Sequence, residues 1–224
     1  MKTIRLFAAA AMLTASTCAL AQFSNAGVSS KGAGTSINTD NYSRFEVSFA
    51  STDIQHFEDP LIGFEAGVIY GQSISKSVPL FLEYGLNLTW TTRDLAEEDD
   101  YYYDDYELRF TTMNIAVPLN LAYKFTFPSN SDIALTPFVG LNFKVNVMAL
   151  ESYDDGYDDE TLNWFDKDDV GKVTTNRFQL GMNLGVGLSY QKIYFGYRFQ
   201  PDFGKFDKYC KKTHTNYVSV GINF

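Results

Sequence analysis

The chain has 224 residues, of which 45% are hydrophobic and 16% aromatic, and its formal net charge is −9. This hydrophobic content excludes a chain that is disordered throughout, and the negative charge disfavours nucleic-acid binding, which depends on basic surfaces. Only two cysteines are present, so a scaffold held together by disulfides is excluded as well.

Residues 1–21 have the features of a cleaved secretory signal. They contain a basic start, an apolar run over 6–13 and a small-residue cleavage site that ends at Ala21. The alternative is a lipoprotein signal acylated at Cys18, but Thr17 stands where that motif has Gly, Ala or Ser. The sequence therefore predicts export across the inner membrane.

The exported chain divides into two parts. Residues 22–41, rich in Ser, Gly, Asn and Thr, are expected to form a flexible periplasmic lead-in. Residues 42–224 are expected to form one barrel domain, with Cys210 as its single thiol. Beyond the signal, no stretch has the ~18 consecutive apolar residues of a membrane helix, so a membrane crossing would use strands.

Hydrophobic alternation at period two marks eight segments, most of them longer than is usual in soluble sheets. The clearest segment sets Leu80 to Trp90 against a polar face, and a later one keeps strict alternation from Phe178 to Tyr190. The predicted strands are 42–51, 62–70, 80–90, 113–124, 133–148, 178–190, 192–200 and 213–224. Pro118 and Pro137 fall inside two of them, and because proline lacks an N–H we expect a bulge or a strand-end effect at both.

The connections between these segments alternate in length. The short ones lie at 73–78, 128–132 and 191, and the longer ones at 52–59, 91–105, 150–173 and 201–212. Short turns at one end, long loops at the other and both chain ends on the short side are typical of an outer-membrane barrel. The sequence predicts an all-β fold: an eight-stranded antiparallel transmembrane β-barrel with short periplasmic turns and long extracellular loops.

A soluble, lipocalin-like barrel has the same period, so the composition of the two faces has to separate the alternatives. The polar face of segment 178–190 consists of Gly, Asn, Ser and Gln, which suits a crowded lumen better than a water-exposed wall. The apolar faces carry the aromatic residues that interfacial girdles require, namely Tyr70, Tyr84, Trp90, Tyr123, Tyr190 and Tyr197. Both observations favour the membrane barrel over the soluble ligand carrier.

Several segments also resemble known barrels. The alternating segment that ends at Phe224 resembles the last strand of bacterial outer-membrane barrels, which implies that Phe224 is a signal for the barrel assembly machinery. Residues 113–125, with an apolar core around Pro118 followed by Tyr-Lys-Phe, resemble a recurring strand of the small outer-membrane β-barrel families of Bacteroidota, of the OmpX-like or PorT-like type. Residues 181–190 and 221–224 resemble later strands of the same families. The resemblance implies a porin-like barrel fold in the outer membrane, in contact with its lipid and lipopolysaccharide, and leaves the function open.

Inward positions of the predicted strands carry charges of both signs. They are Arg44, Glu46, Glu65, Glu83, Lys124, Lys144 and Arg198. The interior of an eight-stranded barrel is just wide enough for side chains to fill, so these charges are expected to pair as a network that closes the lumen. The alternative is a narrow, porin-like channel for ions or small solutes along the same residues.

Two predicted extracellular loops hold 17 of the 27 acidic residues, in the ranges 94–107 and 151–169. One interpretation is a pair of solvated loops; the other is adhesion to an extracellular surface ligand, or capture of divalent cations such as Ca²⁺ by clustered carboxylates. The last loop instead carries Lys205, Lys208, Lys211 and Lys212 around Asp202 and Asp207, with Cys210 as a free thiol or the site of an intermolecular disulfide.

No catalytic, cofactor-binding or metal-binding motif stands out. The only histidines, His56 and His214, lie near predicted extracellular strand ends and at neither metal nor triad spacing. We therefore expect no enzymatic activity and no cofactor, and a structural or surface-interaction role. A lipid-modifying enzyme built on one histidine, with a loop Ser and Asp, is a further alternative.

Overall fold

The computed structural model describes residues 39–54, 59–94, 107–127, 130–154, 159–170, 175–208 and 212–224. Within these ranges eight strands are long: β1 (Tyr42–Ile54), β2 (Leu61–Ser73), β3 (Leu80–Asp94), β4 (Glu107–Tyr123), β6 (Asn130–Asp154), β8 (Phe178–Tyr190), β9 (Ile193–Lys205) and β10 (Lys212–Asn223). The short elements are β5 (Phe125–Phe127), β7 (Asp159–Asn163) and the helix α2 (Lys167–Val170).

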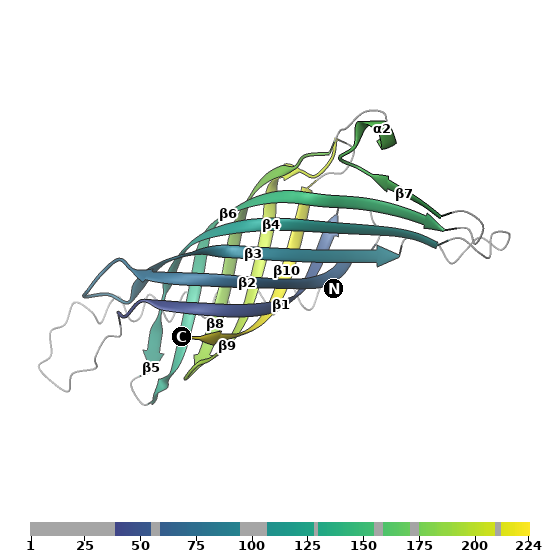
Figure 1. The fold of residues 1–224 in the computed structure, drawn as a ribbon. Helices are drawn as coiled ribbons and strands as arrows, with labels where there is room; N and C mark the ends of the chain where they lie inside the picture. The colour runs from purple at the N-terminus through teal and green to yellow at the C-terminus, as the bar shows by residue number, and fades with distance from the viewer. Residues whose placement is uncertain are drawn as a thin grey trace, which may run out of the picture.

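The eight long strands form a closed antiparallel barrel (Figure 1). Each long strand pairs with the long strands before and after it along the chain, including β4 with β6 on either side of the short β5. The pairing of the first strand, β1, with the last, β10, closes the ring. The backbone of Phe224 continues the pairing of β1 with β10, because its N–H donates to the Ser43 carbonyl at 2.8 Å. The predicted fold class is therefore confirmed.

Several strands extend further at the long-loop end than alternation indicates. β3 runs to Asp94 and β9 to Lys205, while β4 already begins at Glu107. In Figure 1, β4, β6 and β7 continue together beyond the rest of the wall, and β7 pairs with β6 from Leu150 to Asp154. Cross-strand backbone pairing continues here although the hydrophobic pattern has ended, so the predicted strand ends were too short.

The two prolines perturb pairing without producing a bulge. Pro118 pairs with Asn142 in register, but the β3–β4 ladder is interrupted opposite it, between Tyr84 and Asn87. Pro137 lies where β6 changes its partner from β4 to β5. The register shift of the β4–β6 pair falls instead at Met113 and Asn114, so neither proline produces the bulge that was one of the two expected effects; Pro118 interrupts a ladder, and Pro137 lies at the end of the pairing with β4, which is a strand-end effect.

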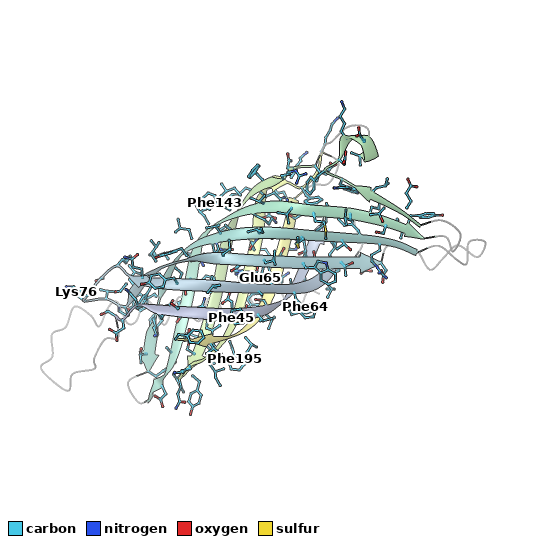
Figure 2. The ribbon with its side chains drawn as sticks, viewed as in Figure 1. Phe45, Phe64, Glu65, Lys76, Phe143 and Phe195 are labelled. Atoms are coloured by element: carbon cyan, nitrogen blue, oxygen red, sulfur yellow. The ribbon has the colours of Figure 1, made fainter. Side chains whose placement is uncertain are left out.

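The barrel wall separates an apolar outer face from a polar inner one. Phe45, Phe64, Phe143 and Phe195 project from the outer face and are 45 to 60% exposed, whereas Glu65 on the inner face is 1% exposed (Figure 2). Successive strand residues point to opposite faces, so each long strand contributes to both. Among the described residues, no helix has the length and apolar character needed to cross a membrane.

Candidate functional site in the barrel interior

The first part of an interior ion-pair network is centred on Arg44 of β1. Its Nε donates to Glu46 Oε2 at 2.8 Å, and its Nη1 donates to Glu83 Oε1 on β3 at 3.1 Å. These three side chains are at most 5% exposed. The Tyr42 hydroxyl donates to the same Glu83 oxygen at 2.5 Å, so this carboxylate accepts from two directions.

The second part of the network is centred on Arg198 of β9. Its Nη2 donates to Glu65 Oε1 at 2.5 Å, and its Nη1 lies 3.7 Å from Glu46 Oε1. The Thr89 hydroxyl donates to the other Glu65 oxygen at 3.0 Å. Glu46 thus links the two arginines, and the central network contains Arg44, Glu46, Glu65, Glu83 and Arg198.

Two buried tyrosines cover the arginines, and sequence reasoning missed both. The guanidinium of Arg44 lies 3.9 Å from the ring centre of Tyr194, and that of Arg198 lies 4.0 Å from the ring centre of Tyr217. Such contacts stabilise a desolvated cation. Period two already places both tyrosines on the inner face, but a count of charged residues does not identify them as partners.

Glycine makes room for Tyr194. A Cβ at Gly187 would lie 2.3 Å from its ring, and a Cβ at Gly196 would lie 2.5 Å from its hydroxyl. Phe138 lies in the same way against Gly185, where a Cβ would come within 2.2 Å of the ring. The glycines of the polar face therefore receive aromatic side chains that fold flat against the wall.

A second polar layer lies nearer the long-loop end and is centred on Asp202. Lys144 Nζ and the Thr213 hydroxyl both donate to Asp202 Oδ2. In the same part of the lumen, Asn146 Nδ2 donates to Gln179 Oε1 at 2.9 Å. Asp202 was expected in a loop, but β9 extends past it and turns its side chain into the barrel.

An apolar plug closes the long-loop end of the barrel. Its buried members come from four strands and two connecting segments: Ile54, Leu61, Phe110, Ala149, Phe165 and Phe206. Trp164 packs against them with its ring centre 4.8 Å from that of Phe110, and its Nε1 donates to Glu151 at 2.8 Å. Between the central network and this plug, the buried side chains leave a small cavity of about 20 Å³, which Lys144, Gln179 and Phe206 line.

The short-turn end is open by comparison. A cavity of about 330 Å³ lies there, and Arg44 and Lys124 line it together with Thr136 and Ser189. Lys124 Nζ lies 5.4 Å from the ring centre of Tyr42. Burial lowers the pKa of Lys124, and the nearby Asp40 carboxylate opposes that shift.

Of the seven inward charges indicated by the sequence, five meet in the central network. Lys144 belongs instead to the layer around Asp202, and Lys124 lies at the open end. Phe224 lies on the outer face and is 74% exposed, and its role in assembly stays a prediction. His56, Cys210, Lys211 and the acidic residues at 97–105 and 155–158 lie outside the described residues.

The surface charges of the long-loop end form local pairs. Arg93 donates to Asp59 at 2.6 Å and Arg109 donates to Asp94 at 2.7 Å. Within the described ranges, no group of three or more His, Cys, Asp or Glu side chains is arranged to hold a metal ion. Cation binding by the acidic loops therefore stays a prediction.

A model of the family described as "outer membrane protein beta-barrel domain" matches residues 20–207. The chain belongs to this family, which confirms its resemblance to small outer-membrane barrels. Outer-membrane barrels have short periplasmic turns and longer extracellular loops, so the short-turn end is periplasmic and the long-loop end extracellular.

Among solved structures, the chain is similar to Ail, the attachment invasion locus protein of Yersinia pestis, in complex with the heparin analogue sucrose octasulfate. The identity is 12%, the match covers 83% of this chain and 99% of Ail, and the TM-score is 0.46. For Neisserial surface protein A the identity is 13%, the coverage 82% and 95%, and the TM-score 0.42. For the outer membrane protein OprG of Pseudomonas aeruginosa the identity is 10%, the match covers 82% of this chain and 95% of OprG, and the TM-score is 0.37. No curated protein sequence matches the chain.

Proposed function

We propose that this outer-membrane barrel is closed to solutes and acts at the cell surface, as a structural or surface-interaction protein. The observation that carries the proposal is the succession of side-chain layers across the lumen. The central network and the layer around Asp202 cross the interior, and the plug covers their extracellular side. Moving an ion past these layers would separate buried charge pairs, which is costly because the freed charges lose both partner and water.

The extracellular end supplies the surface for interaction. β4, β6 and β7 extend the wall outward as a small sheet that carries Glu151 and Glu160 and adjoins the acid-rich loops. An acidic surface attracts cationic partners at a distance, and this attraction weakens as salt increases. The ligand class that fits is a basic protein segment or another polycationic surface.

Conductance in planar bilayers tests the closed lumen. Wild-type protein is expected to give no stable open steps, because the network spans β1, β2, β3 and β9. The variant Arg44→Ala with Arg198→Ala, Lys144→Ala and Trp164→Ala breaks the central network, the layer around Asp202 and the plug together, and we expect it to give small cation-selective steps. Thr92→Val, which changes an outward-facing position, is the matched control. Reproducible open steps in the wild type would favour the narrow channel and refute the proposal.

Binding to polylysine-coated beads tests the surface role. Cells that display the wild type are expected to bind the beads more than cells without the protein, and the excess is expected to fall when NaCl is raised. Glu151→Gln with Glu160→Gln should reduce binding, whereas Lys76→Gln in the periplasmic turn should not. Titration with Ca²⁺ in a calorimeter distinguishes the capture of divalent cations from adhesion to a cationic surface, because only cation capture gives a saturable heat. Equal binding by cells with and without the protein would contradict the surface role.

A further inference from the structure

The apolar outer face ends in a polar patch where β1 and β10 meet near the extracellular end. Outward residues of β1 are apolar from Phe45 to Phe49, and those of β10 are apolar from Ile222 to Val218. Towards the extracellular end the next outward positions are polar, namely Ser51 and Asp53 on β1 and Asn216 and His214 on β10. The strand register makes Ser51 face Asn216 and Asp53 face His214. We call these four residues the seam notch.

Apolar residues flank the notch on both sides. Ile62 of β2 pairs with Ser51 and is 41% exposed. Phe199 of β9 pairs with Asn216, and Phe203 beyond it is 50% exposed. The notch therefore lies at the extracellular edge of the apolar belt, where β3 and β4 also turn polar at Thr92 and Thr111, and it extends roughly 7 Å along each strand at ~3.3 Å per residue.

Contacts within the wall fix the side chains of the notch. His214 Nε2 lies 3.4 Å from Asp53 Oδ2, and both side chains remain about 30% exposed. The ring of Phe199 meets the imidazole edge to face at 5.7 Å. The Tyr197 hydroxyl donates to Asn216 Oδ1 at 2.8 Å. Among the described residues, the Asn216 amide nitrogen and the Ser51 hydroxyl have no protein partner, so donors and acceptors face the lipid.

We infer that the seam notch binds the sugar headgroup of a glycolipid in the outer leaflet. A sugar hydroxyl both donates and accepts, so it can donate to the Asp53 carboxylate and accept from the Asn216 amide. A lipid phosphate only accepts and would be repelled by Asp53, and an acyl chain would leave the Asn216 amide nitrogen and the Ser51 hydroxyl without a partner. This site lies on the barrel wall, so the inference is independent of the surface role proposed for the loops.

Native mass spectrometry of the folded, delipidated barrel tests the inference. The probes are lipid A, which has sugars and phosphates, digalactosyl diacylglycerol, which has sugars alone, and phosphatidic acid, which has a phosphate alone. We expect one tightly retained molecule of either glycolipid per barrel and about tenfold weaker retention of phosphatidic acid. Tenfold corresponds to the net contribution of one or two hydrogen bonds.

Two double variants locate the site. Asp53→Leu with His214→Leu, and Ser51→Val with Asn216→Val, each replace one facing pair by apolar residues that suit a lipid-exposed wall. Each is expected to reduce glycolipid retention about tenfold, and neither is expected to reduce the retention of phosphatidic acid. Thr92→Val with Thr111→Val is the control, because these outward hydroxyls on β3 and β4 pair with each other at 2.9 Å.

A shift in gel mobility between unboiled and boiled samples verifies that each variant is folded. Equal retention of all three lipids by the wild type, stronger retention of phosphatidic acid, or unchanged glycolipid retention in both notch variants would overturn the inference. A barrel dimer that the notch variants abolish would also overturn it, because a second copy would then occupy the notch.

Discussion

The pair formed by Arg198 and Glu65 is a sharp test of how the closed lumen is stabilised. Its two atoms are 2.5 Å apart, and the side chains are 6% and 1% exposed. In Arg198→Leu, Glu65 keeps only its hydrogen bond from Thr89, while Glu46 keeps Arg44. One buried carboxylate is thus left without a cation, and removal of one partner from a buried pair costs about 3–5 kcal/mol.

The double variant Arg198→Leu with Glu65→Leu behaves differently. Replacing a whole buried ion pair by apolar residues is often neutral or stabilising, so we expect it to lie within about 1 kcal/mol of the wild type. Glu65→Leu alone leaves the Arg198 cation with Glu46 at 3.7 Å and should cost about 3 kcal/mol. The coupling free energy from this double-mutant cycle should therefore be about 5 kcal/mol or more.

Reversible urea unfolding of the barrel in lipid vesicles, followed by tryptophan fluorescence, gives the free energy of unfolding for each variant. The slope against urea has to stay the same across the series, because a changed slope indicates a changed unfolded or folded state. If the effects of the two single substitutions add within about 0.5 kcal/mol, the two residues are independent and the network described here does not stabilise the barrel.

Three further predictions concern packing, assembly and closure. Gly187→Ala should lower the free energy of unfolding by about 1–3 kcal/mol because its Cβ meets the Tyr194 ring, whereas Gly204→Ala, with no atom within 4 Å of the new Cβ, should be neutral by the same urea assay. Deleting Phe224 should reduce the heat-modifiable band in outer-membrane fractions while refolding of the purified chain into vesicles is unchanged; equal bands would contradict an assembly role. Trp164→Ala should loosen the plug and speed hydrogen exchange in β7 and α2 but not in β8, and uniform acceleration would indicate general destabilisation instead.

Alternation predicted the fold well because the two faces of each strand meet different surroundings. Where that contrast ends, the prediction ended too: β9 continues through Pro201 to Lys205, and Asp202 was placed in a loop although it is buried in the lumen. A residue pattern indicates which side chains point inward. It does not indicate how far backbone pairing continues after the hydrophobic alternation has ended.

The ion pairs within the lumen could not be predicted from the sequence for a different reason. Arg198 and Glu65 are 133 residues apart, and their contact depends on the stagger that accumulates around the ring. Seven inward charges can be paired in many ways, and only the register of all eight strands selects one. Lys124 shows the same limit, because it has the parity of an inward residue but lies at the periplasmic opening.

The composition of the central network also makes it a check on barrel closure. β9 contributes Arg198, whereas the carboxylates that receive it lie on β1 and β2, so these pairs form only when the last strands meet the first. A closure slipped by two residues would keep every side chain on its correct face, yet it would move Arg198 roughly 7 Å from its partners. Such a misaligned barrel would still present an apolar face to the lipid, but its buried ion pairs would be broken. The buried charges therefore distinguish the correct register between β1 and β10 from slipped registers that bury the same apolar surface in lipid.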